Sequence, residues 1–222
     1  MNHQILYQPS FAVAKVTLQP GESVRAEPGA MMSMSPTVEV QSTMQGGIGK
    51  ALGRMLGGES LFQSTYTATQ GPGEILLAPA SPGDIMPLQL QGNAWMITSG
   101  CFLACDSHLE FSTQMSGRSF FGGEGLFIMR VAGTGTVLVN TFGAIHALQL
   151  APGQPYVVDT GHIVAFSEGM GYEVRKVTKS ILGSLTSGEG FVVVLTGPGL
   201  VYLQTRTPQG FAGWLSGMLP SR

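Results

Sequence analysis

Three glutamates recur at a spacing that could do chemistry. Glu59, Glu124 and Glu189 lie 65 residues apart, and each follows a glycine and precedes a small residue and two apolar ones. Three carboxylates that converge on one axis would bind a cation through their oxygens. The same side chains spread around a ring would instead accept backbone N–H groups in glycine turns. The turn interpretation is favoured, because each Gly-Glu segment stands where the chain must enter a strand sharply.

His146, Asp159 and His162 are a second set of candidates, since their side chains can bind a metal. The stretch PGQPYVVDTGHIVAF resembles the second motif of cupins, but His162 follows Gly161 directly instead of by three positions. The first cupin motif, with its paired histidines and glutamate, is missing. Two interpretations therefore stay open: a metal site, or a half-buried histidine bonded to the backbone.

No residue is assigned as catalytic and no cofactor is expected. The chain has no G-x-S-x-G motif. Asp106, Ser107 and His108 are neighbours in the sequence, whereas a catalytic triad brings its members together from separate segments. The sequence leaves open whether the protein is an enzyme, and a non-enzymatic role is favoured.

Two glycine-containing stretches predict short amphipathic helices. GGIGKALGRMLGGES (46–60) fails the phosphate-loop and dinucleotide patterns, which excludes nucleotide binding by those motifs. One helical face gathers the apolar residues Ile48, Leu52, Met55 and Leu56. The C-terminal stretch FAGWLSGMLPSR repeats this pattern with Phe211, Trp214, Leu215 and Met218. Each face would dock on the protein's own sheet, on another subunit or protein, or on a lipid surface.

The composition limits the classes of partner. Only 11% of the 222 residues are charged and the net charge is −2, so there is no basic footprint for nucleic acid. A surface with so few charges favours burial in a homo-oligomer. No apolar run is long enough to span a membrane. Cys101 and Cys105 are read as buried thiols in a reducing compartment, which places the protein in the cytoplasm.

The glycine pattern indicates three internal repeats. A G-x-G turn follows each recurring glutamate, at Gly71, Gly133 and Gly197, and an apolar strand follows each turn. Upstream, two glycines eight residues apart enclose a strand three times, starting at Gly21, Gly92 and Gly153. We therefore expect one all-β domain with pseudo-threefold symmetry, plus the short helices. Its repeats cover about 1–81, 82–147 and 148–208, and a C-terminal amphipathic tail covers 209–222.

The motifs LQPGESVRAEPGAMMSM, GGESLF, GGEGLF and TGPG together resemble the altered-inheritance-of-mitochondria twenty-four family, over roughly residues 5–208. The resemblance implies a fold like the tryptophan RNA-binding attenuation protein, a short double-stranded β-helix type repeated within the chain. Bacterial members are mostly of unknown function, and mitochondrial relatives are linked to inner-membrane organisation and respiratory-chain upkeep. The resemblance implies no catalytic residues, and the RNA and tryptophan binding of the fold is not transferred.

Two functions follow as hypotheses. The first is a non-enzymatic, self-associating scaffold or interaction protein, accessory to membrane or respiratory organisation, with a protein partner or a membrane surface as its further contact. The alternative is a small-ligand-binding or metal-dependent cupin-like protein that uses the interior of a β-barrel.

Overall fold

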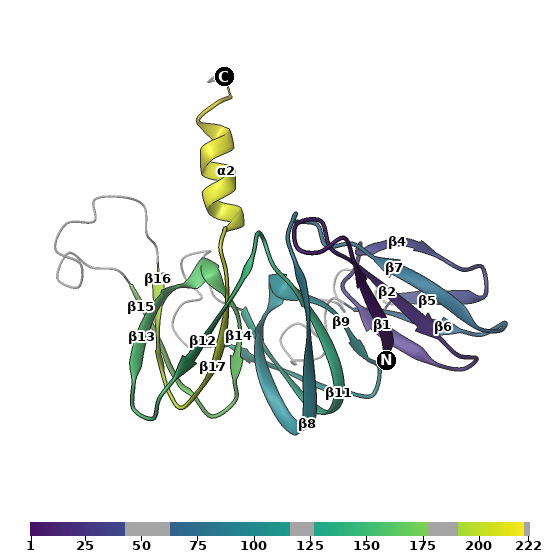
Figure 1. Cartoon of the computed structure of the whole chain (residues 1–222), viewed down its shortest axis with the longest axis horizontal. Coiled ribbons are helices and arrows are strands. Elements are labelled where there is room, and N and C mark those ends of the chain that lie inside the picture. The colour runs from purple at the N-terminus through teal and green to yellow at the C-terminus, as the bar shows by residue number, and fades with distance from the viewer. Residues whose placement is uncertain (43–62, 116–126, 177–190, 220–222) are drawn as a thin grey trace, which may run out of the picture.

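The chain folds into an elongated body of antiparallel β-sheet from which one helix projects (Figure 1). The computed structural model describes residues 1–42, 63–115, 127–176 and 191–219. The N-terminal strands lie at one end of the body, the middle strands at its centre and the C-terminal strands at the other end.

The N-terminal strands form two layers around one core. They are β1 (Asn2–Leu6), β2 (Val13–Leu18), β3 (Ser23–Ala26), β4 (Met31–Met34), β5 (Val38–Ser42), β6 (Ser64–Ala68) and β7 (Gly73–Leu77). In one layer β7 lies between β2 and β4, and in the other β6 lies between β3 and β5. Burial alternates along β6, so that one face of that strand packs on the core while the other is half-buried. Val16, Val24 and Leu77 meet in the resulting core cluster.

A long hairpin dominates the middle of the molecule. The elements here are β8 (Ile85–Thr98), the 3-10 helix η1 (Ser99–Cys101), β9 (Phe102–Asp106), β10 (Glu110–Met115) and β11 (Phe127–Asn140). β8 and β11 pair over their whole lengths, with a register shift between Gly133 and Thr134. β10 pairs with β11 before this irregularity and β9 pairs with β11 after it. The shift therefore divides β11 into two halves that pair with different neighbouring strands.

The C-terminal strands again form two layers. They are β12 (Ile145–Leu150), β13 (Pro155–Asp159), β14 (Ile163–Ser167), β15 (Gly171–Lys176), β16 (Phe191–Thr196) and β17 (Gly199–Gln204), with the 3-10 helix η3 (Thr160–His162) before β14. β17 lies between β12 and β14, and β16 lies between β13 and β15. Helix α2 (Pro208–Ser216) follows β17 directly and points away from the sheets (Figure 1).

Two strand pairs join the three groups into one body. β3 pairs with β9, and β8 pairs with β14, both antiparallel. These junctions make a ten-stranded sheet that runs from β5 at one end to β12 at the other. Three clusters of buried side chains lie along this sheet, and the middle cluster includes Trp95, Phe102 and Val164 from different strands. The core is therefore a row of three packed centres.

The structure confirms the expected all-β class and the expected C-terminal helix. The apolar strands predicted after the G-x-G turns are present as β7, the second half of β11, and β17. At Gly199 an added Cβ would lie 2.4 Å from Met170 Sδ, so this turn position has no room for a side chain. The helix predicted around residues 48–56 lies outside the described residues.

Candidate interaction surface

Helix α2 begins and ends at residues with clear local signals. The Thr207 side chain accepts a hydrogen bond from the Gly210 N–H at 3.0 Å, and Pro208 occupies the first turn. At the other end the Gly217 N–H donates to the Gly213 carbonyl at 3.2 Å. Nine residues containing two glycines form a helix of marginal stability in water. Such a helix gains most of its stability from contacts of its apolar face.

The base of α2 is held by aromatic and polar contacts. Phe211 meets Phe142 edge to face, with ring centroids 5.6 Å apart. The Phe142 N–H in turn donates to Oε1 of Gln204 at 2.9 Å. Nε2 of the same glutamine donates to the Gly161 carbonyl at 2.7 Å, so one buried side chain ties β17, η3 and the loop before β12 together. This network fixes where the helix leaves the body.

Above its base, α2 presents apolar side chains to solvent. Trp214 is 56% exposed and Met218 is 63% exposed. Phe211, Leu215 and Leu219 are also exposed, and residues 208–219 contain no charged side chain. Trp214 packs against the Phe211 ring, with centroids 5.7 Å apart. We call these five residues, Phe211, Trp214, Leu215, Met218 and Leu219, the α2 surface. Exposed apolar side chains grouped on one short segment are the kind of surface that protein interaction sites use.

Two strands at opposite ends of the body also expose apolar side chains. Met31 and Met32 of β4 are 39% and 61% exposed. Tyr156 and Val157 of β13 are 41% and 52% exposed. The sequence alone does not single out Tyr156 and Val157, because their exposure depends on which strands become sheet edges.

The structure places two of the three metal candidates, Asp159 and His162, against backbone groups. Nδ1 of His162 lies 2.6 Å from the Gln204 carbonyl, and Oδ1 of Asp159 accepts the Gly161 N–H at 2.8 Å at the start of η3. His146 is exposed on β12. Among the residues that the structure describes, no three His, Cys, Asp or Glu side chains are placed to hold a metal ion. Asp159 and His162 thus act locally as a turn acceptor and a backbone partner.

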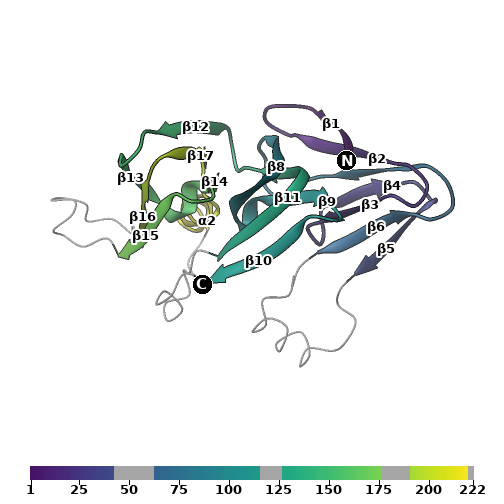
Figure 2. The same ribbon diagram turned by 90° about the horizontal axis from the view of Figure 1, so that it is seen from below.

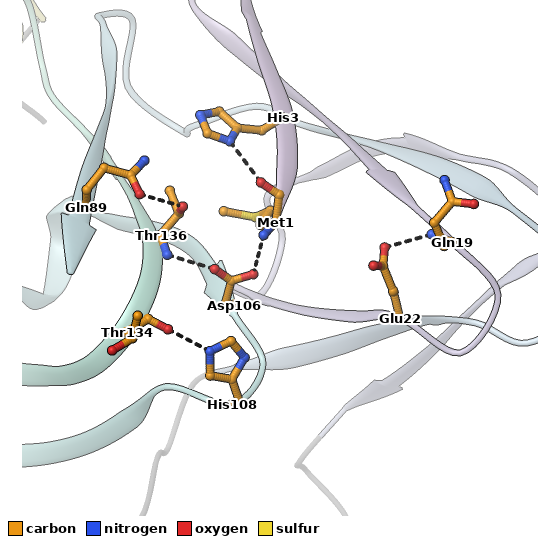
Figure 3. Close-up of polar contacts among 9 residues, drawn as sticks. All are labelled: Met1, His3, Gln19, Glu22, Gln89, Asp106, His108, Thr134 and Thr136. Carbon is orange, nitrogen blue, oxygen red and sulfur yellow. Dashed lines mark hydrogen bonds and ion pairs between the residues drawn. The ribbon is translucent and has the colours of Figure 1, made fainter. Parts of the chain in front are cut away.

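A polar cluster around Asp106 links distant strands (Figure 3). The two carboxylate oxygens of Asp106 contact the Met1 α-amino group at 2.6 Å and the Thr136 N–H at 2.7 Å. Nε2 of His108 instead lies 2.8 Å from the Thr134 carbonyl. Asp106 and His108 therefore bond to different backbone groups, and these bonds hold turns and strand ends in place.

The remaining candidates are two buried thiols and several residues that lie outside the described residues. Cys101 and Cys105 are free and buried, which confirms their interpretation as small apolar residues. Desolvation raises the pKa of each thiol to about 12. The candidates that lie outside the described residues are Glu59, Glu124, Glu189, Ile48, Leu52, Met55 and Leu56.

Comparisons with known proteins agree over nearly the whole chain. The family model described as Mitochondrial biogenesis AIM24 matches residues 3–206. An uncharacterised protein of Streptococcus pyogenes serotype M6 is 34% identical over 221 residues, covering 95% of this chain and 88% of that protein. An X-ray crystal structure of another Streptococcus pyogenes protein matches with a TM-score of 0.86 and 31% identity, covering 98% of this chain and 99% of that one.

Proposed function

The chain belongs to the Mitochondrial biogenesis AIM24 family, and we propose that it is a non-enzymatic, self-associating scaffold protein. The observation that carries this proposal is the α2 surface, which exposes Phe211 and Trp214 on an uncharged helix. The occupant we propose for this surface is a second copy of the chain. The similar Streptococcus pyogenes protein is itself uncharacterised, so the proposal depends on the geometry of this chain.

Charge favours a second copy over the other occupants. The α2 surface has no basic residue to attract phosphate or anionic lipid, and no acidic residue to attract a basic partner. With only 11% charged residues, the chain offers other copies of itself an equally charge-poor surface. Trp and Phe are also the residue types that contribute most to protein interfaces.

Burial of Trp214 alone would stabilise the assembly substantially. Its side chain is 56% exposed, which for a tryptophan of up to ~250 Å² leaves roughly 140 Å² available for burial. At ~25 cal/mol per Å² this area corresponds to about 3.5 kcal/mol. A free energy of that size is equivalent to a change of more than about a hundredfold in dissociation constant.

We also propose that the scaffold consists of three copies of one strand module. The antiparallel pair β2–β7 is matched by β12–β17 and by the β8–β11 half from Ile85 to Leu90. The pair β4–β7 is matched by β9–β11 and β14–β17. The pair β5–β6 is matched by β10–β11 and β15–β16. Because Ile145–Leu150 is one strand, we propose that the last module begins near residue 145.

A recurring side-chain contact supports the same module. After each G-x-G turn, a backbone N–H donates to the side chain that ends an earlier strand. These contacts are Glu74 N–H to Ser35 Oγ at 3.0 Å, Thr136 N–H to Asp106 Oδ2 at 2.7 Å, and Leu200 N–H to Ser167 Oγ at 3.0 Å. Repeated modules are expected to make equivalent contacts at equivalent positions. Nothing else in the fold requires this contact to occur three times.

The cellular setting of the proposal rests on the family and on two observations. The described helices include none that is long and apolar enough to cross a membrane. The buried free thiols suit a reducing compartment, so we place the scaffold in the cytoplasm. An accessory role in membrane or respiratory organisation is the part of the proposal that follows from the family resemblance alone. For the metal-dependent alternative, the described residues offer no group of three His, Cys, Asp or Glu side chains that could hold a metal ion.

Trp214→Ser tests the proposal with little effect on the helix itself, since tryptophan and serine have similar helix propensity. We expect the dissociation constant of the oligomer, measured by sedimentation velocity on the full chain, to rise by more than about a hundredfold. The melting temperature of the dissociated protein should change little, because Trp214 is more than half exposed and its printed ring contact is with Phe211 of the same helix.

Phe11→Ser is the matched control, because Phe11 is an aromatic residue that is 72% exposed outside α2. This control should leave the oligomer intact. If the Trp214→Ser variant forms an oligomer as stable as that of wild type, α2 is not the contact. A wild-type protein that is monomeric yet cosediments with phosphatidylcholine vesicles would show that the occupant is lipid.

A further inference from the structure

Two junctions between strand groups use the same register. At the first junction β3 pairs with β9, with Val24 opposite Asp106 and Arg25 opposite Cys105. At the second β8 pairs with β14, with Trp95 opposite Ser167 and Met96 opposite Phe166. Counted from the glycines that open the two turns, Gly21 and Gly92, Val24 and Trp95 hold the same position. One pairing rule therefore operates twice within the chain.

By the same rule, one strand at each end of the body has a free edge. Counted from Gly153, the strand that corresponds to β3 and the second half of β8 is β13. The strand that corresponds to β9 and β14 is β4. Within the part of the chain that the structure describes, β13 pairs with β16 alone and β4 with β7 alone, so each is the outermost strand of its sheet.

Burial shows the consequence of these open edges. All five residues of β9 and the first four of β14 are buried. In β4 the first three residues are exposed, and so are the first three of β13. The large exposed side chains are apolar, with Met32 at 61% and Val157 at 52%, whereas Ser33 is polar. Positions that are buried in β9 and β14 are thus exposed in β4.

We propose that β13 of one copy of the chain pairs with β4 of a second copy, in the antiparallel register of the two internal junctions. This inference rests on the proposed self-association and adds a second contact between copies beside the α2 surface. The expected opposite residues are Tyr156 with Ser35, Val157 with Met34, and Val158 with Ser33. Continuity with β3–β9 and β8–β14 is the reason to choose a second copy as the partner.

The backbone groups of the two edges are oriented for this pairing. The Gly197 N–H donates to the Gln154 carbonyl, and alternate residues of a strand face the same neighbour. The peptide groups of Val157 therefore face away from β16. By the same reasoning the Ser35 N–H, which donates to the Glu74 carbonyl, turns the peptide groups of Met34 away from β7. Val157 and Met34 are the two residues that the register places opposite each other.

The ends of the body make the contact head to tail. β13 and β4 lie at opposite ends of the long axis in both views (Figures 1 and 2). A chain with one copy of each edge adds a neighbour at both ends. Such a heterologous contact closes into a ring or continues as a filament, depending on the rotation between copies.

Cysteine cross-linking between two single variants tests the register. Opposite residues that exchange hydrogen bonds have Cα atoms about 5.5 Å apart, which suits a disulfide. Val157→Cys and Met34→Cys proteins, mixed and oxidised, should give a disulfide-linked dimer as the main product. The native thiols add no background, because both are buried and burial raises the pKa of each to about 12.

The controls separate this geometry from its alternatives. Val40 is an exposed valine on the edge strand β5, and Val157→Cys mixed with Val40→Cys should give no dimer beyond the level of either variant alone. A wild-type oligomer without the Val157–Met34 dimer would overturn the edge pairing and leave the scaffold function standing. A disulfide that forms only within one chain carrying both Met34→Cys and Val157→Cys would also overturn the edge pairing. A monomeric wild type would overturn both proposals.

Discussion

Gln204→Leu removes the polar hub beneath α2 and keeps a similar side-chain size. The side chain is 7% exposed. Its Oε1 accepts the Phe142 N–H at 2.9 Å, and its Nε2 donates to the Gly161 carbonyl at 2.7 Å. Leucine satisfies neither group, and both contacts are partly shielded from water. The His162 contact is retained, because it goes to the carbonyl of residue 204 and not to the side chain.

The expected cost follows from the two groups that lose their partner. A fully buried donor or acceptor left unsatisfied costs about 1–3 kcal/mol. Because these two contacts are only part-buried, the pair should destabilise the protein by ~2–4 kcal/mol, the lower part of the range for two groups. For a chain of this length each kcal/mol lowers the melting temperature by about 2–4 °C. The melting temperature should therefore fall by roughly 5–15 °C.

Urea unfolding followed by circular dichroism measures this loss, with Gln149→Leu as control. Gln149 also donates through Nε2 to a backbone carbonyl, that of Gly199 at 3.0 Å, but it is exposed and water can replace the contact. The control should change the free energy of unfolding by no more than ~0.5 kcal/mol. Equal free energies of unfolding for the two variants would refute the reasoning that burial makes Gln204 costly to replace.

Two further predictions concern buried titratable groups. Burial raises the pKa of Glu27 above its ordinary value of 4.5, so the folded protein loses stability as pH rises through that raised pKa. Glu27→Gln should therefore be more stable than wild type at pH 7 and lose this advantage toward pH 4 in urea titrations; an advantage that grows with acidity would contradict the assignment. Cys101 and Cys105 should resist a maleimide at pH 7.5 in folded protein and react fully in guanidinium, as followed by intact mass. Rapid labelling of the folded protein would show that the thiols are accessible.

Local patterns in the sequence predicted much of the architecture. The apolar residues Phe211, Trp214, Leu215 and Met218 recur at helical spacing, and the structure has a helix there. Glycines at turns predicted strands on either side, because a glycine turn allows backbone angles that other residues avoid. Gly21, Gly92 and Gly153 all have φ between 73° and 84°.

Features that depend on the assembled sheet could not be predicted. Gln204 is a lone glutamine at the end of a strand, and its role emerges only when Phe142 and Gly161 are folded against it. Val157 and Met32 become candidates because their strands are sheet edges, which is a property of topology. Asp159 and His162 lie close in the sequence, but each is used by a backbone group nearby.

Native mass spectrometry of the untagged full chain at low micromolar concentration tests self-association most directly. The account predicts a multiple of the 23.3 kDa chain mass that persists on dilution and carries no stoichiometric small molecule. A spectrum of monomer alone would contradict the scaffold. A monomer with a stoichiometric added mass would favour the ligand- or metal-dependent alternative.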